Sequence, residues 1–365
     1  MLMSKQHYAI ALANQGNIVY FISHPDLNRL LRRGEINIEQ TSYRNISVVK
    51  SRLIHPYFLK FKCKWLYNFL TGIHINRILN KIGKEPDVVW LFDIGNSIPL
   101  KYFPKRARKI YMPVDGPYGT KEEEEGAIGA DIIISVTNEI IAQFNKSSIP
   151  SFCINHGVAD IFINLPKKFV PNSKIRIGYS GSILRNDIDT EVFLKIIRLH
   201  PNAIFEIWGE YDYLKSNIHN PDDVPDKTIN FIKELETQTN VILHGAVSSV
   251  ELANGLKRMD CFILIYDSRG FYNTMSNSHK MLEYLASGKA IVSSYISYYE
   301  SYPNLITMVK DKNSNDEFPN LFSEVINNIA FYNSVSKQKE KIDFAKHFTY
   351  QRQVDKIEKI LTEFS

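Results

Sequence analysis

The sequence predicts an α/β protein with two domains, each built on a parallel sheet that is covered by helices on both faces. Three observations predict this fold class. Short apolar runs rich in β-branched residues alternate with helical patterns along most of the chain. These runs are apolar at consecutive positions, which is typical of strands buried on both faces of a parallel sheet. The length of 365 residues also exceeds the usual size of one hydrophobic core.

The first half begins with a helical pattern at Lys5–Asn14. Its expected strands span residues 17–23, 87–93, 109–115 and 131–137. A parallel α/β domain ordinarily opens with a strand, so the first strand of this domain is missing from the pattern.

The second half alternates more regularly. Strands are expected at 174–180, 203–209, 240–246, 261–267 and 290–294, and helices near 189–200, from Ser248, at 278–287 and at 350–364. Residues 210–240 contain two prolines and several aspartates, which predicts a surface excursion. Proline, asparagine and lysine gather in "INHGVADIFINLPKKFVPNSK", where we place the domain boundary. We expect domains at 1–165 and 166–347 and a final helical segment at 348–365.

Composition and charge exclude several classes of protein. The longest apolar runs, "CFILIY" and "DIIISV", are far shorter than the roughly 20 residues that span a bilayer. The N-terminus lacks the pattern of a signal peptide, and the three cysteines have no zinc-ligand or disulfide spacing, so a cytoplasmic location is expected. Residues 1–112 carry 18 basic and 6 acidic residues (net +12), whereas the remainder carries 26 and 33 (net −7). This asymmetry indicates an anionic partner for the first half.

The stretch "SHKMLEYLASGKAIVSS" holds the first candidate site. Gly288 is expected to end the helix of this stretch. Lys280 lies in the first turn of that helix, where a cation faces the positive end of the helix dipole. A bound diphosphate would offset that unfavourable pairing, and Glu283, one turn further, could accept hydrogen bonds from the vicinal hydroxyls of a sugar. The alternatives are a surface lysine and an ordinary i,i+3 pair between the two side chains.

Two further stretches follow strands. In "IRIGYSGSILRNDID", Gly181 and Ser182 form a turn at the carboxyl edge of the sheet, where such folds bind ligands, and Arg185 could bind a phosphate oxygen. A plain tight turn with a surface arginine is the alternative. His244 and Gly245 end another strand, where their backbone could bond a nucleobase, unless the histidine simply faces solvent. Ser248 and Glu251 have the spacing of a capping box.

Four motifs occur together and in a family's order. "SNSHKMLEYLASGKAIVSS" resembles the nucleotide-sugar helix of the GT-B glycosyltransferases, in particular of the family-4-like and teichuronic-acid-type branch. "HGAVSSVELANGLKRMDCFILIY" is similar to that family's strand–helix–strand unit, and "INHGVADIF" to its hinge. "YMPVDGPYGTKEEEEGAIGADIIISVTNEI" resembles its first-domain segment. The resemblance covers most of the chain and is strongest over residues 175–293.

The resemblance implies a GT-B fold, with two Rossmann-like domains facing a cleft and a final helix that packs back across both. It implies that the second domain holds a nucleoside-diphosphate sugar and the first an acceptor. Lys280 and Arg185 would bind the diphosphate, Glu283 the ribose hydroxyls, Gly181 and Ser182 would form the phosphate loop, and backbone at His244 and Gly245 would approach the base. Many members carry a second glutamate eight residues before the helix glutamate, where this chain has Met275.

The expected reaction is transfer of a hexosyl-type sugar, with Arg185, Lys280 and the helix dipole stabilising the leaving diphosphate. No convincing metal-binding carboxylate pair occurs, so neither a metal nor another cofactor is expected. An inverting enzyme needs a general base, for which Asp115 is the candidate and Asp93 the alternative. Both aspartates follow expected strands, where aspartate also caps helices and forms turns.

The basic first half suggests where the acceptor lies. Residues 52–83 mix six cations with six aromatic residues and contain no acid, which suits an anionic membrane surface. A lipid-linked saccharide acceptor in cell-surface polysaccharide assembly would require such peripheral docking. A core helix with a solvated basic face is the alternative, and no nucleic-acid-binding motif occurs. Two other functions remain open: a non-catalytic GT-B protein that binds nucleotide, membrane or a partner, and a nucleotide-sugar epimerase.

Overall fold

The computed structural model describes residues 4–114, 120–170, 173–214, 224–267, 269 and 278–364. The chain divides into two compact units. The C-terminal unit spans His156–Thr349, and the N-terminal unit combines Ser4–Asn155 with Tyr350–Ser365. The first boundary falls within "INHGV", between Asn155 and His156. The last helix belongs with the first half of the chain although it is remote in sequence.

The C-terminal unit is built on one six-stranded parallel sheet, in the order β10-β9-β8-β11-β12-β13. Its strands are β8 (Arg176–Ser180), β9 (Ile204–Trp208), β10 (Val241–Gly245), β11 (Cys261–Leu264), β12 (Ala290–Ser293) and β13 (Thr307–Met308). The side chains of β11 and β12 are buried throughout, as the consecutive apolar residues predict for strands covered on both faces.

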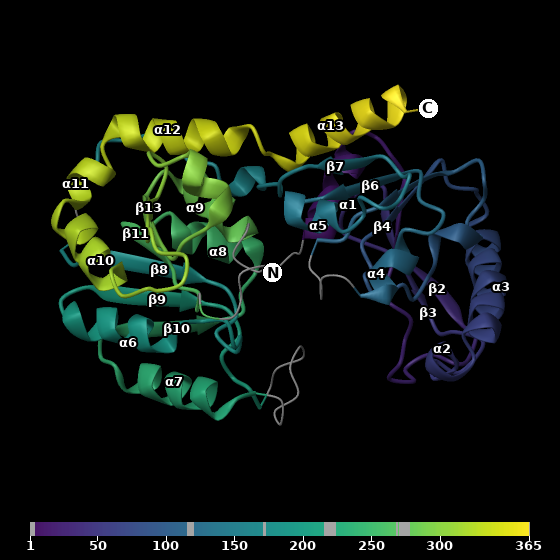
Figure 1. Cartoon of the computed structure of the whole chain (residues 1–365), viewed down its shortest axis with the longest axis horizontal. Coiled ribbons are helices and arrows are strands. Elements are labelled where there is room, and N and C mark those ends of the chain that lie inside the picture. The colour runs from purple at the N-terminus through teal and green to yellow at the C-terminus, as the bar shows by residue number, and fades with distance from the viewer. Residues whose placement is uncertain are drawn as a thin grey trace. The chain divides into compact units, whose positions relative to one another are not determined.

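Helices cover both faces of this sheet (Figure 1). Their bounds are α6 (Thr190–Leu199), α7 (Asp226–Thr237), α8 (Ser249–Leu256), α9 (His279–Ser287), α10 (Phe318–Asn327), α11 (Ile329–Tyr332) and α12 (Val335–Lys346). Helix α9 packs against α12, and α6 packs against α7 and α10. Parallel strands joined by helices run in one direction, so all their carboxyl ends meet at one edge.

The N-terminal unit contains two sheets. One is parallel and ordered β4-β5-β6-β7; the other is ordered β1-β3-β2, with β1 parallel and β2 antiparallel to β3. The strands are β1 (Val19–Ile22), β2 (Ile36–Gln40), β3 (Ile46–Ser51), β4 (Val88–Leu91), β5 (Arg108–Tyr111), β6 (Ile132–Ser135) and β7 (Ser151–Cys153). Among the described residues β1 and β4 each pair on one side only, although Ile22 and Val89 reach the same small core around Ile75.

The helices of this unit are α1 (Ser4–Asn14), α2 (Leu59–Lys62), α3 (Lys64–Ile82), α4 (Lys121–Gly126), α5 (Asn138–Ala142) and α13 (Tyr350–Glu363). Helix α13 packs on α1, where Tyr350 stacks on His7 with ring centroids 4.8 Å apart and meets Tyr8 edge-on at 5.1 Å (Figure 1). The last helix therefore returns to the unit in which the chain began, as the resemblance implied.

Two sequence expectations were wrong in detail. Residues 210–240 include α7, because Pro225 begins a helix whose Phe231, Ile232 and Leu235 are buried. The first half is not uniformly parallel, since β2 and β3 form an antiparallel pair. No helix of the described chain is both long and apolar enough to cross a membrane.

Candidate functional site

Three glycines line the carboxyl edge of the C-terminal sheet. Gly181, Gly209 and Gly245 follow or end the neighbouring strands β8, β9 and β10, with positive φ angles of 136°, 145° and 72°. The N–H of Gly181 donates to the Trp208 carbonyl at 2.6 Å, and that of Gly209 to the Gly245 carbonyl at 2.8 Å. A side chain at Gly209 would come within 2.1 Å of the Gly181 carbonyl oxygen. The φ values of Gly181 and Gly209 and this close approach require glycine, while Gly245 adopts the left-handed conformation that glycine favours.

Helix α9 brings Lys280 against the first of these glycines. A Cβ atom added to Gly181 would lie 2.0 Å from Lys280 Nζ, so the ammonium group occupies the space that a side chain there would fill. Lys280 Nζ also lies 5.3 Å from the centre of the Tyr179 ring, within the range of a cation–π contact. The sequence candidates Gly181 and Lys280 thus meet at the sheet edge, although 98 residues separate them along the chain.

The Lys280 side chain is buried and forms no ion pair with any residue that the structure describes. Only 6% of Lys280 is exposed, and its Nζ atom has no hydrogen-bond partner among the described residues. Helix α9 begins at Ser278, whose side chain makes no capping hydrogen bond, so the positive end of the helix dipole lies beside the same ammonium group. A buried, unpaired cation costs several kcal/mol unless an anion joins it. The arrangement is therefore suited to an anionic ligand.

Glu283 lies one turn further along α9 and is also buried. It is 9% exposed, and its Oε2 atom has no hydrogen-bond partner within the described part of the chain. Burial raises the pKa of Glu283 to about 8, against the opposing effect of the Lys280 ammonium. Residues 280–287 of α9 are all buried, so the alternative of a surface lysine at position 280 is wrong. Gly288 ends the helix in the left-handed conformation that its position predicted.

Two buried tyrosines contact this part of the site. Tyr179 lies against the Lys280 ammonium group, and Tyr284 hydrogen-bonds to the end of β8. Tyr284 Oη accepts a hydrogen bond from Ser180 N–H at 2.7 Å, which ties α9 to the end of β8. Burial raises the pKa of Tyr179 well above its ordinary value, and the Arg185 guanidinium opposes that rise. Arg185 and Lys280 are therefore both close to the Tyr179 ring.

Arg185 already has a carboxylate partner. Its Nε atom donates to Asp187 Oδ1 at 2.7 Å, and Nη2 donates to the other carboxylate oxygen. The Asp187 carboxylate raises the pKa of the guanidinium, which also lies 5.7 Å from the centre of the Tyr266 ring. Arg185 is held in place by these contacts, so it could bind a phosphate only with the donors that Asp187 leaves unused.

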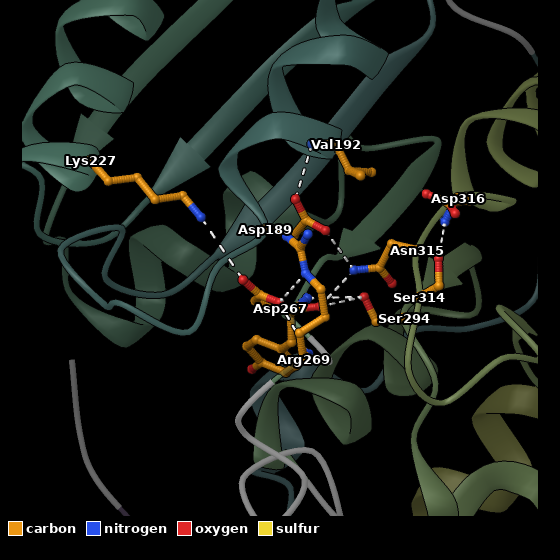
Figure 2. Close-up of polar contacts among 10 residues, drawn as sticks. Asp189, Val192, Lys227, Asp267, Arg269, Ser294, Ser314, Asn315 and Asp316 are labelled. Atoms are coloured by element: carbon orange, nitrogen blue, oxygen red, sulfur yellow. Dashed lines mark hydrogen bonds and ion pairs between the residues drawn. The ribbon is translucent and has the colours of Figure 1, made fainter.

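A polar network holds the neighbouring loops at this edge (Figure 2). Asp189 caps α6 by accepting from Val192 N–H at 3.1 Å, and its second oxygen accepts from the Asn315 side chain at 2.9 Å. Asn315 also donates to the Tyr266 carbonyl at 2.8 Å. These hydrogen bonds connect the loop after β8 to the loop after β11. Arg185 belongs to the first of these loops, so the contacts hold its backbone in place.

Ser182 and His244 are occupied by structural contacts. Ser182 Oγ accepts from Leu184 N–H at 3.2 Å and so closes the turn after β8. The His244 ring stacks on Trp208 with centroids 4.7 Å apart, and its Nε2 lies 2.8 Å from the buried Glu206 carboxylate. The backbone of Gly245 remains at the sheet edge, where the base was expected to lie.

The proposed general bases lie in the N-terminal unit. Asp115 is outside the described residues, as is Met275. Asp93 accepts hydrogen bonds from Gly95 N–H at 2.9 Å and Ser97 N–H at 2.8 Å, one on each carboxylate oxygen, so it forms the turn after β4. Within the described ranges no three His, Cys, Asp or Glu side chains gather closely enough to hold a metal ion.

Sequence reasoning missed Gly209 and the two tyrosines. The signal for Gly209 was present, because "EIWGE" repeats the strand-then-glycine pattern of "GYSGS". Tyr179 and Tyr284 looked like ordinary core residues, and only the packing of α9 on β8 brings them beneath Lys280.

Comparison with solved structures identifies the fold. Trehalose-6-phosphate synthase from E. coli bound with UDP-2-fluoro glucose aligns with a TM-score of 0.66 at 12% identity, over 98% of this chain and 95% of that one. Sucrose-phosphate synthase from Thermosynechococcus elongatus gives 0.65 at 11% identity, over 98% and 92%. Both are GT-B proteins. The fold is therefore GT-B.

A third structure, TarM, aligns with a TM-score of 0.56 at 18% identity over 81% of this chain. The chain spans only 58% of the length of TarM. No protein-family model and no curated protein sequence matches the chain. The GT-B fold confirms the expectation of two α/β units with parallel sheets and a returning terminal helix.

Proposed function

We propose that the protein is a glycosyltransferase that moves a sugar from a nucleoside-diphosphate donor to a saccharide acceptor. The observation that carries the proposal is the buried Lys280 ammonium, which lies beside Gly181 and the start of α9 and has no partner within the described residues. A diphosphate would supply the missing negative charge and would accept from the helix N–H groups. A binding site for UDP is a known property of one structural neighbour, which was solved with UDP-2-fluoro glucose.

Each residue then has a role in holding the donor. Lys280, the dipole of α9 and the unused donors of Arg185 stabilise the negative charge that develops on the leaving diphosphate. Glu283, whose pKa burial raises to about 8, accepts a hydrogen bond from one ribose hydroxyl through its carbonyl oxygen and donates its own proton to the other. Gly181 and Gly209 leave room for the phosphates, since neither places a Cβ atom at the sheet edge. No metal or other cofactor is required for these contacts.

The acceptor part of the proposal comes from the charge of the first half. We infer that the acceptor is a lipid-linked saccharide in cell-surface polysaccharide assembly. The sugar would be transferred to it on the cytoplasmic side of a membrane. The transferred sugar is of the hexosyl type, and Asp115 is the proposed base if the reaction inverts configuration. Asp93 is a weaker candidate, because both of its oxygens already accept backbone hydrogen bonds.

Nucleotide binding tests the donor site directly. Thermal shift and calorimetry with UDP, GDP and TDP should show micromolar-to-millimolar binding of one of them, lost in Lys280→Ala and in Glu283→Ala. Lys257→Ala, which removes an exposed lysine at the end of α8 in the same unit, is the matched control and should bind normally. Unchanged affinity in both site variants would overturn the assignment.

A second candidate function is a GT-B protein that binds nucleotide without transferring sugar. It is favoured by Arg185 and Asp93, which are both engaged in structural contacts. Purified protein given donor and a lipid-linked acceptor distinguishes the two, because any glycosylated product excludes the non-catalytic function. Donor incubated alone tests for an epimerase, which would convert the sugar without an acceptor.

A further inference from the structure

The outward face of α2 and α3 is apolar. Five large side chains are exposed there: Phe58 (55%), Phe61 (75%), Trp65 (72%), Phe69 (59%) and Ile73 (40%). Trp65, Phe69 and Ile73 recur every four residues and so lie along one side of α3, whereas Phe58 and Phe61 precede the non-helical Cys63 that separates α2 from α3. We call these five residues the aromatic stripe. Helices α2 and α3 lie at the side of the N-terminal unit away from its parallel sheet (Figure 1).

The inward face of the same segment is partly polar. Thr71 and His74 are buried, and His74 Nε2 lies 3.1 Å from Ser51 Oγ beneath the helix. The other large buried side chains of α3, Tyr67, Ile75 and Ile78, already supply its apolar contact with the core, and a surface helix normally carries polar residues on its outward face. Burial in the core of its own unit therefore does not explain the aromatic stripe. Contiguous exposed apolar residues of this kind mark an interaction surface.

Cations surround the aromatic stripe. No acidic residue occurs from Arg52 to Lys84. Lys62 Nζ lies 5.9 Å from the centre of the Phe58 ring, and Lys60 Nζ lies 5.9 Å from that of Phe61. Lys62 is exposed, so its charged end can reach polar surroundings while its stem lies along the ring, whereas the Lys60 ammonium group donates to the Gly95 carbonyl. The sole salt bridge to an acid that the structure shows in this segment joins Lys64 to Glu125, within the described residues.

A second exposed segment adjoins the end of the aromatic stripe. The loop "LNRLLRRG", residues 27–34, exposes Leu27 (50%) and Leu30 (85%) together with three arginines, Arg29, Arg32 and Arg33. Arg77, one turn beyond Ile73 on α3, donates to the Gly34 carbonyl at 3.2 Å and so holds this loop against the helix. We call residues 27–34 the basic loop.

The carboxylates that flank the basic loop are already used within it. Asp26 accepts from Asn28 N–H at 3.0 Å and from Leu31 N–H at 2.7 Å. Glu35 accepts from Arg32 N–H at 2.7 Å. All three arginines of the loop are exposed. Hydrogen bonds from Arg32 N–H and Asn37 lower the pKa of the Glu35 carboxylate, and Arg32 lies near enough for its charge to help lower it further.

We propose that the aromatic stripe and the basic loop together dock the protein on an anionic lipid bilayer. The aromatic side chains would enter the boundary between headgroups and acyl chains, and the arginines and lysines would bind lipid phosphates. The positive charge of this surface favours an anionic bilayer over a second copy of the chain as its partner, because two copies would bring the same cations together. The proposal goes beyond the transfer reaction and does not depend on it.

Vesicle binding tests the proposal, with the fluorescence of Trp65 as the intrinsic probe. Trp65 is 72% exposed, whereas Trp208 in the C-terminal unit is 2% exposed. Vesicles of phosphatidylcholine and phosphatidylglycerol should shift the tryptophan emission of the full chain to shorter wavelength and should carry it into the pellet on sedimentation. Vesicles of phosphatidylcholine alone should bind at least tenfold more weakly, and salt should weaken binding to the anionic vesicles.

Two sets of variants separate the apolar and the charged contributions. The double variant Phe61→Ser/Trp65→Ser should lower partitioning at least tenfold. The triple variant Arg29→Gln/Arg32→Gln/Arg33→Gln should lower it by about 100-fold, from about 1 kcal/mol for each cation at an anionic surface. Phe331→Ser removes an aromatic side chain that is 61% exposed in the C-terminal unit and should bind normally.

Thermal stabilisation by a nucleoside diphosphate is measured on the same preparations. Stripe and loop variants should retain whatever nucleotide response the wild-type protein shows, so failure of vesicle binding and failure of the proposed transferase function are distinguishable. The proposal is overturned if the protein ignores anionic vesicles, if neutral vesicles bind equally well, or if either set of variants binds like wild type. It is also overturned if the stripe instead mediates a dimer in solution, lost in Phe61→Ser/Trp65→Ser, without vesicle binding.

Discussion

Replacing Glu283 by glutamine is expected to stabilise the ligand-free protein at neutral pH but not at acidic pH. Burial raises the pKa of this carboxyl from 4.5 to about 8. Because the folded pKa lies above the unfolded value, the stability from this group is fully present below pH 4.5 and is lost as pH rises toward 8. Glutamine does not titrate, so the variant avoids this loss.

The size of the effect follows from the two pKa values. Between pH 5 and pH 7.5 the wild-type protein should lose about 3 kcal/mol of unfolding free energy through this carboxyl alone, when its pKa changes from 4.5 to about 8 on folding. For a unit the size of the C-terminal one, that corresponds to about 6–12 °C in Tm. Any fixed cost of burying the amide is the same at both pH values and cancels in the comparison.

The assay is differential scanning calorimetry or fluorimetry of both proteins at pH 5 and pH 7.5. Glu236→Gln, which removes an exposed carboxylate of α7 in the same unit, is the control for a general change in net charge. The Tm of Glu283→Gln minus that of wild type should increase strongly with pH, while the control difference stays small. An equal Glu283→Gln difference at both pH values would refute the inferred desolvation. Loss of the nucleotide response in the stabilised variant would further show that the buried carboxyl serves binding at the expense of stability.

Three other substitutions test the same geometry. Lys280→Met should raise the stability of the ligand-free protein by about 1–3 kcal/mol, because it removes an unpaired buried charge, yet abolish nucleotide binding; a destabilised variant in chemical denaturation would show that the ammonium group is satisfied without ligand. Gly181→Ala should lower nucleotide affinity at least tenfold in calorimetry, since its Cβ would lie 2.0 Å from Lys280 Nζ and its φ is 136°; wild-type affinity would contradict the close approach. Gly255→Ala should destabilise the protein by about 1–3 kcal/mol despite the helix preference of alanine. The reason is that its Cβ would come within 2.6 Å of the Trp208 ring, and a rise in Tm would show that the ring can move.

Local sequence was sufficient for the elements of the C-terminal unit. Consecutive apolar residues predicted its strands, and the Ser248–Glu251 spacing predicted a capping box that the structure shows at the start of α8. Gly288 predicted the end of α9, and Lys280 was placed correctly in its first turn. These features depend on neighbours within one turn of helix or a few residues of strand, so their signals lie in a short window of sequence.

The sequence was weaker where pairing is remote. The strands β2 and β3 were not predicted, and their antiparallel pairing could not be, because strand direction depends on partners and connections rather than on composition. Helix α7 was missed within a stretch rich in proline and aspartate, although its buried residues recur at helical spacing. Arg185 looked free in sequence, and only the fold of the loop brings its guanidinium onto the Asp187 carboxylate.

The sequence by itself determined the fold class, the carboxyl edge where the candidate site lies, and the residues Gly181, Lys280 and Glu283. Only the tertiary structure decided that residues 280–287 of α9 are all buried, that the ammonium group of Lys280 fills the space beside Gly181, and that the Glu283 carboxyl holds its proton near neutral pH. It also decided which face of α3 meets solvent. The physical reason is that hydrophobic periodicity can be read from a short stretch of sequence. The desolvation and charge pairing of an ionisable side chain depend on every element packed around it.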